Sequence, residues 1–360
     1  MKKKKGRKKV AARCWCPKCK GGVPVSGVVK RAERWERLRG FEFEFDSEKQ
    51  MEVVSARGAC KEHLTFCDGR CKRNVGAGEV WECDCELCVE KKTKVVKAPE
   101  CDGHGCVEKV PLDRWFEGVI KNGAAETQVP VVGELNQYGH APKSAFMWHL
   151  KSDRSCGFEI ASPPCDGERM AIMVRPLMEK IAEEEKKHKG SFVTSRCGLH
   201  CTIGVEDFNQ ANLGRLIYFV STHQDAFLQT QAVERANNPT CAKIQKFGAK
   251  DKRKLETNVM ELADDLVSAE GGNRYRVANF TRAIKDKVVE FRFGSMTTDW
   301  KKIVAYGTMV ECIVQAALDG RTSTKGTALE RFYDCVFAPY AGSERVKMAW
   351  DIIKEGARGK

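Results

Sequence analysis

The sequence predicts an α+β fold in which antiparallel strands, mostly paired in hairpins, are backed by helices. Several short segments alternate apolar and polar residues, which is the period of a half-buried strand. Longer segments repeat apolar residues every three or four positions, as amphipathic helices do. Neither G-x₄-G-K-[ST] nor G-x-G-x-x-G occurs, so the sequence indicates no P-loop and no dinucleotide-binding fold.

Segment 39–46 is the clearest strand, because aromatic and acidic residues alternate strictly along it. Its three phenylalanines would share one face, and Glu42 and Glu44 the other. Two carboxylates about 7 Å apart on one strand face can each hold a divalent cation. A solvated outer face explains the same pattern, and this motif alone does not decide between the two interpretations.

The remaining elements follow in order along the chain. Alternation predicts strands at 146–151, 157–164, 197–204 and 287–294, of which the first two form a hairpin that ends at two prolines. Periodicity predicts helices at 112–121, 168–189, 209–230, 255–268, 301–318 and near 343–356. Pro176 is expected to bend the second of these helices.

The net charge of +13 is concentrated at the N-terminus. Residues 1–39 contain 15 Lys or Arg and 2 Asp or Glu, whereas the other 321 residues contain 47 of each kind. Any weak contact with nucleic acid is therefore expected in the basic tail. No apolar segment follows the basic start, and segment 303–318 is too short to span a bilayer, so we expect a cytoplasmic protein without a membrane span.

Cysteines are concentrated in the first third of the chain. Eleven of the eighteen lie between residues 14 and 106, and the spacing C-x-C-x₂-C occurs twice. In a protein without an export signal this distribution predicts structural Zn²⁺ rather than disulfides. The candidate zinc ligands are Cys14, Cys16, Cys19, Cys60, Cys67, Cys71, Cys83, Cys85, Cys88, Cys101 and Cys106, with His63 and His104 among them.

These features suggest three regions. Residues 1–38 form a basic tail with a cysteine knuckle, residues 39–360 form the main domain, and residues 56–110 form a zinc-binding insertion within it. Two or three zinc ions would satisfy the thirteen candidate ligands, whose pairing cannot be derived from their order. The seven later cysteines show no ligand spacing and are expected to be buried as small apolar side chains.

Polar groups that could hold metal and phosphate occur on four of the predicted strands. They are Glu42 and Glu44, Glu159, His200, and Glu290 with Arg292. A sheet that bends around a cavity would bring them together and provide oxygen ligands for Mg²⁺, an imidazole, and a guanidinium for phosphate. This set suits phosphoryl transfer. For the last pair, an exposed ion pair worth ~0–1 kcal/mol is the alternative.

Five ordered motifs resemble those of the amidoligases, a family similar to glutamine synthetase and glutamate–cysteine ligase. The resemblance covers about residues 39–320. The motifs are R-G-F-E-F-E at 39–44, W-H-L-K-S-D-R-S at 148–155 with E-I-A-S-P-P at 159–164, C-G-L-H-C-T-I-G at 197–204, N-R-Y-R-V-A-N at 273–279, and V-E-F-R-F at 289–293.

The resemblance implies a funnel-shaped antiparallel sheet that directs ATP and an acid substrate to two or three Mg²⁺ ions. The acid is phosphorylated to an acyl phosphate, and an amine then displaces phosphate to form an amide. Matched by motif, the Mg²⁺ ligands are Glu42, Glu44, Glu159 and Glu290, the catalytic residues are His200 and Arg292, and the nucleotide contacts are His200, Arg292 and Arg235.

The chain departs from the family pattern at two places. Thr202 stands where the family commonly has a second histidine, and D-R-S at 153–155 stands where relatives usually have D-G-S. An alternative function is a zinc-ribbon adaptor for nucleic acid or protein on an inactive ligase fold. The acid and amine substrates, small molecules or peptides, are not identified by the sequence.

Overall fold

The computed structural model describes residues 37–46, 63–66, 72–75, 80–82, 95–97, 112–127, 129, 131–132, 147–153, 156–187, 191–268 and 273–358. Its main feature is a seven-stranded sheet in the order β10-β11-β9-β1-β8-β7-β6, in which six strands are antiparallel and β6 pairs with β7 in parallel. The strands are β1 (Arg39–Asp46), β6 (Val131–Val132), β7 (Trp148–Asp153), β8 (Gly157–Ala161), β9 (Gly198–Gly204), β10 (Ala278–Asn279) and β11 (Val288–Ser295).

Helices follow or separate these strands. They are α2 (Leu112–Glu126), α3 (Gly167–Lys187), α4 (Gln210–Gln229), α5 (Val233–Ala236), α6 (Ala249–Thr257), α7 (Val259–Val267), α8 (Trp300–Leu318), α9 (Ala328–Val336) and α10 (Glu344–Arg358), with 3₁₀ turns η2 (Pro239–Cys241) and η3 (Ala338–Tyr340). Two separate hairpins pair β2 (His63–Phe66) with β3 (Lys72–Val75) and β4 (Val80–Glu82) with β5 (Val95–Lys97). The predicted antiparallel sheet backed by helices is confirmed.

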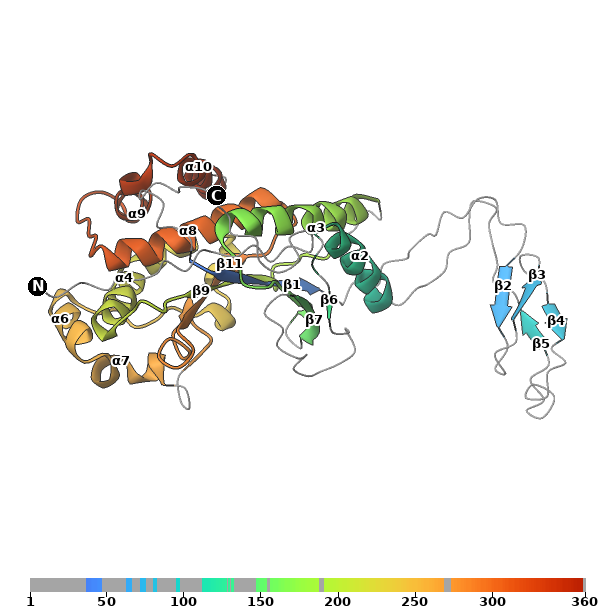
Figure 1. Ribbon diagram of the computed structural model, residues 1–360, viewed down its shortest axis with the longest axis horizontal. Coiled ribbons are helices and arrows are strands. Elements are labelled where there is room, and N and C mark those ends of the chain that lie inside the picture. Colours follow the sequence, from blue (N-terminus) through green and yellow to red (C-terminus); the bar gives the residue numbers. More distant parts are fainter. Residues whose placement is uncertain are drawn as a thin grey trace, which may run out of the picture.

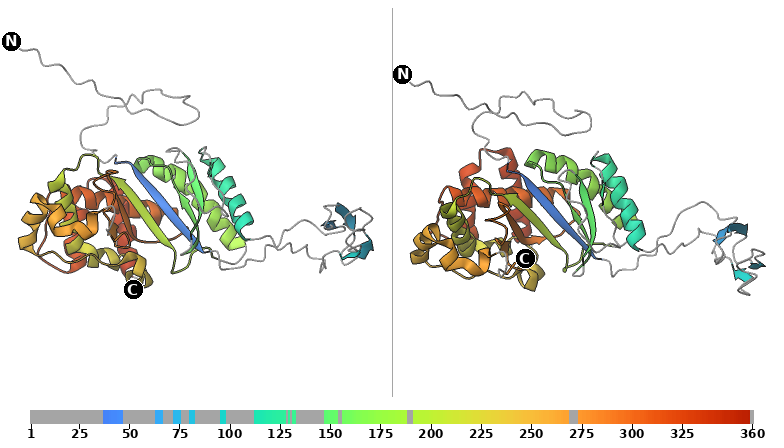
Figure 2. Two further views of the ribbon diagram at one scale, coloured as in Figure 1. Left: turned by 90° about the horizontal axis from the view of Figure 1, so that it is seen from below. Right: turned by 60° about the horizontal axis from the view of Figure 1, so that its bottom comes forward.

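The two faces of the main sheet differ because β1 alternates in sequence. Its three phenylalanines are buried against the helical side, where Phe45 lies 5.0 Å from Phe116 of α2 and Phe43 lies 6.2 Å from Trp148 of β7. Figure 1 shows α3 and α8 along this side of the sheet, and Figure 2 shows β1 and β9 in front of the helices when the molecule is seen from below. Burial of each phenylalanine contributes about 1.5–3 kcal/mol.

Glycines allow the helices to approach closely. A Cβ atom at Gly307 of α8 would lie 2.6 Å from Cζ of Phe41, so this glycine lets α8 pack directly on β1. A Cβ atom at Gly123 of α2 would lie 3.1 Å from a methyl group of Leu177 on α3. Helix α2 includes Gly123 and ends at Glu126, five residues beyond the predicted end at residue 121.

Most predicted elements occur within one or two residues of their expected bounds, but the helix predicted at 255–268 is wrong. The chain forms two helices there, α6 and α7, which are separated by Asn258. This residue has non-helical dihedral angles, φ −150° and ψ 80°, and its side chain accepts a hydrogen bond from the backbone N–H of Glu261. Asn258 therefore caps the second helix and ends the first.

The seven later cysteines are buried and form no disulfide, as predicted. Burial raises the pKa of Cys165 and of Cys201 to about 12, so both thiols stay protonated. The eleven predicted zinc ligands lie outside the described residues, as does nearly all of the basic tail. The zinc-binding insertion, the tail and the adaptor hypothesis therefore remain predictions. Among the described helices, none is long and apolar enough to cross a membrane.

A buried ion network connects β1 to two helices. Arg39, the first residue of β1, donates from Nη1 to Oε2 of Glu311 at 2.8 Å and to the carbonyl of Gly307 at 3.0 Å, both on α8. Arg345 of α10 donates to the same carboxylate oxygen at 3.2 Å. Burial raises the pKa of Glu311, although the charges of both arginines act in the opposite direction.

We expect Glu311→Leu to reduce the free energy of unfolding by about 3–5 kcal/mol, because Arg39 is then buried without its counter-charge. The double variant Arg39→Met/Glu311→Leu removes both charges and should recover most of this loss. Urea denaturation measures both values. As a control, Asp286→Ala removes an exposed pair with Arg282 and should cost less than about 1 kcal/mol. A double variant as unstable as Glu311→Leu would contradict this account.

Candidate active site

The register of the main sheet places acidic side chains side by side on the face opposite the phenylalanines. Glu44 of β1 lies directly opposite Glu159 of β8, and Glu42 lies opposite His200 of β9. On the other side of β9, Glu290 of β11 lies opposite Thr202. Directly opposite residues share a face and have Cβ atoms about 4.5–5.5 Å apart, so these side chains form one continuous polar surface.

His200 is at the centre of this surface and is only 2% exposed. Its Nδ1 atom lies 3.5 Å from Oε2 of Glu42 and 3.5 Å from Oε1 of Glu290, and forms no hydrogen bond. One ligand atom from each of these three residues lies within 4.8 Å of the other two. Two carboxylates and an imidazole nitrogen at this spacing fit a single divalent cation.

The other imidazole nitrogen has an acceptor that suits metal binding. Nε2 of His200 lies 3.4 Å from Oε1 of Glu44. A cation on Nδ1 requires the ring proton to be on Nε2, and the carboxylate of Glu44 can accept it there. Glu44 is in turn held by the backbone N–H of Gly198, which donates to Oε2 at 2.5 Å.

Glu290 and Glu159 are also held in place by neighbouring side chains. Oε1 of Glu290 accepts a hydrogen bond from Nη1 of Arg292 at 2.5 Å, and Oε2 accepts one from Nδ2 of Asn279 at 2.8 Å. Oε1 of Glu159 lies 2.5 Å from Nζ of Lys151 on β7. The carboxylates are therefore oriented before any ligand binds.

Positive charge keeps the surface ionised. Burial acts to raise the pKa of Glu42, but contact with His200 and the charges of Lys151 and Arg292 outweigh it and lower this pKa to about 2. For Arg292, burial acts to lower the pKa, and the surrounding carboxylates, Glu290 first among them, raise it instead. Both groups are charged at neutral pH.

Arg235 brings a second guanidinium to the same surface. It lies on α5, directly after α4, and is 1% exposed. Its Nη2 atom donates to the carbonyl of Arg292 at 2.6 Å and lies 3.2 Å from Nε2 of His200. With the ring proton on Nε2, as a cation on Nδ1 requires, this 3.2 Å contact is not a hydrogen bond, because arginine can only donate. Its Nε and Nη1 atoms are buried without a hydrogen-bond partner. Because such groups are costly to leave unpaired, they indicate a place for an anionic ligand.

Gly198 makes this arrangement sterically feasible. A Cβ atom at Gly198 would lie 2.4 Å from Nη2 of Arg235 and 2.8 Å from Nε2 of His200. Any side chain there would displace the arginine or the imidazole. Gly198 and His200 are two residues apart on β9 and therefore share a face. This spacing is the sequence signal for the need of a glycine beside the histidine.

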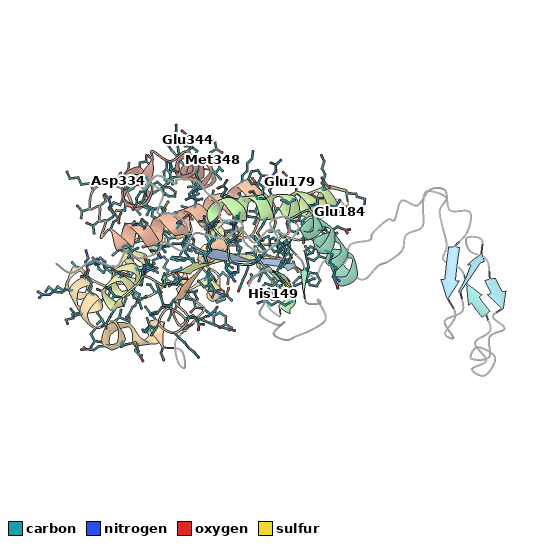
Figure 3. All side chains as sticks on the ribbon, in the orientation of Figure 1. His149, Glu179, Glu184, Asp334, Glu344 and Met348 are labelled. Atoms are coloured by element: carbon teal, nitrogen blue, oxygen red, sulfur yellow. The ribbon has the colours of Figure 1, made fainter. Side chains whose placement is uncertain are left out.

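The structure brings together the seven residues that the resemblance singles out, including Arg235, whose position in the motif is the least specific. Two further side chains contact this site, Lys151 through Glu159 and Asn279 through Glu290. Both lie within the quoted motifs, but the resemblance implies no role for either. Figure 3 shows His149, two residues before Lys151 on β7, and shows Glu179 and Glu184 on α3, on the far side of the sheet.

Comparison with protein-family models agrees with the motifs. A family model described as a "putative amidoligase enzyme" matches residues 36–314. No curated protein matches the chain. A solved structure of the complex between the prokaryotic ubiquitin-like protein Pup and its ligase PafA is similar at 12% identity and a TM-score of 0.28, and the match covers 90% of this chain and 58% of that one. Since the family model covers well over half of the sequence, this chain belongs to the amidoligase family.

Proposed function

We propose that this chain is an ATP-dependent ligase that joins a carboxylic acid to an amine through an acyl phosphate. The observation that carries the proposal is the convergence of four carboxylates, one imidazole and two arginines on one face of the sheet. The substrates would be a small-molecule or peptide acid and an amine of either kind. Membership of the amidoligase family supports the same reaction class.

The charges of the surface fit a metal–nucleotide complex. Its four carboxylates face three cations, Lys151, Arg235 and Arg292, which leaves one net negative charge. Asp46 at the end of β1 and Arg196 just before β9 form an ion pair and leave this balance unchanged. Two divalent cations would make the surface strongly positive and complementary to a triphosphate.

We infer two positions for Mg²⁺ on this surface. Glu42, His200 and Glu290 would hold one ion, and Glu44 and Glu159 would contribute to a second. Bound Mg²⁺ neutralises phosphate oxygens and so favours phosphoryl transfer. Because its pKa is about 2, Glu42 is a poor proton acceptor and suits the role of metal ligand.

The reaction would proceed in two displacements. A carboxylate oxygen of the acid attacks the γ-phosphorus of ATP, and ADP leaves with the electron pair of the broken bond. The amine nitrogen then attacks the carbonyl carbon of the acyl phosphate, phosphate leaves, and the nitrogen loses a proton. Arg292 would stabilise the negative charge of the transferring phosphoryl group, and Arg235, whose Nε and Nη1 have no hydrogen-bond partner, would bind phosphate oxygens.

A trapping experiment tests the acyl phosphate. Purified protein is incubated with ATP, Mg²⁺, hydroxylamine and a panel of amino acids, peptides and other carboxylic acids. We expect one class of acid to give a hydroxamate together with equal amounts of ADP and phosphate, and none without Mg²⁺. Glu290→Gln should reduce this rate by about 100-fold or more, because it removes a charged ligand from the ion that neutralises the phosphates.

The matched control is Glu355→Gln, which makes the same change on the outer side of α10 and should leave the rate unchanged. Circular dichroism and thermal melting establish that both variants are folded. Undiminished turnover in Glu290→Gln would remove this residue from the site. ADP release by the wild type without any hydroxamate would exclude the acyl phosphate.

We also expect Gly198→Ala to lose activity while the protein remains folded. The added methyl group would occupy the space of the Arg235 guanidinium and the His200 ring, and a displacement of about 1 Å in such a site costs about 100-fold in rate. Gly118→Ala is the control, because a Cβ atom there would have no neighbour within 4 Å. Equal turnover by both variants would show that the close contact with Gly198 is not needed.

A further inference from the structure

Lys151 has no part in the mechanism above, yet it lies at one of the two metal positions. It is on β7, directly opposite Glu159 of β8, and its Nζ atom lies 2.5 Å from Oε1 of that carboxylate. The two side chains differ in exposure, since Lys151 is 40% exposed and Glu159 is 5% exposed. A buried carboxylate is thus neutralised by a cation whose own side chain reaches solvent.

The carboxylate of Glu159 requires a counter-charge for a physical reason. It lies opposite Glu44 on β1, so two buried carboxylates are neighbours on one face of the sheet. A buried charge without compensation costs several kcal/mol. A divalent cation shared by Glu44 and Glu159 would satisfy both, and in its absence the ammonium of Lys151 provides the positive charge.

A lysine is suited to leaving such a carboxylate when a metal ion binds there. Its ammonium is a strongly hydrated point charge on a flexible four-carbon stem, and the exposed fraction of Lys151 gives it a path to water. Arginine would bind a carboxylate through two parallel hydrogen bonds and would leave less readily.

We propose that Lys151 is a displaceable counter-cation for the second metal position. It neutralises Glu159 when this position holds no divalent ion, and it moves away when an ion binds between Glu159 and Glu44. The inference rests on the proposed function, because it assumes that the polar surface binds two divalent cations. It assigns to Lys151 the role of a positioning residue that sets the concentration at which the second ion binds.

Direct metal titration tests the role without requiring a substrate. Mn²⁺ binding to the full chain, followed by electron paramagnetic resonance, should show a tighter and a weaker class of site. Lys151→Met removes the competing charge and should tighten the weaker site by about fivefold while leaving the tighter site unchanged. Lys151→Arg keeps the charge and should give no tightening. Glu159→Gln should abolish the weaker site.

The control is Lys121→Met, which removes an exposed lysine that pairs with Glu117 on α2 and should leave both sites unchanged. Thermal melting of each variant establishes folding. Equal affinity of the weaker site in wild type and Lys151→Met, with loss of that site in Glu159→Gln, would overturn the role of Lys151 and leave the proposed function intact. Absence of Mn²⁺ binding by the wild type would overturn both.

Discussion

The two-residue period of β1 is the constraint on which the rest of this structure depends. Because successive side chains point to opposite faces, the same eight residues supply the aromatic contacts to the helices and the carboxylates of the candidate site. A shift of register by one residue would expose the phenylalanines and bury the acids against the helices. The hydrophobic effect that fixes the strand therefore also fixes the position of Glu42 and Glu44.

The polar face of the sheet by itself lowers the stability of the fold. Three carboxylates, one of them buried and two partly buried, are crowded around His200, and two nitrogen atoms of Arg235 have no hydrogen-bond partner. Such groups cost free energy that the apolar face must offset. This concentration of incompletely satisfied charge in one place is typical of a site that is completed by ions and an anionic substrate.

Strands β1, β7, β8, β9 and β11 could be predicted because period two is a local property of the sequence, and so could the polar residues along them, whereas the two-residue strands β6 and β10 are too short to leave such a pattern. What could not be predicted was contact between elements distant in the chain. Gly123 interrupts a helical pattern locally, yet it is a packing position against α3. Asn258 falls within a continuous helical pattern, yet its side chain caps a new helix there, so that two helices form instead of one. The approach of Arg235 to His200 depends on α5, a helix of four residues too short to leave a periodic signal.

The ion network at Arg39 has a consequence for how the chain folds during synthesis. Arg39 and Glu311 are 272 residues apart, and Arg345 is further still. At about 5–20 residues per second, the ribosome needs on the order of ten seconds or more to deliver the carboxylate after the arginine has emerged. During that interval β1, with its alternating phenylalanines, lacks β9 until residue 204 has been made and lacks α8 until the end. The strand that organises the candidate site is thus made early and completed late, and until then its apolar face and its strand edges are open to aggregation.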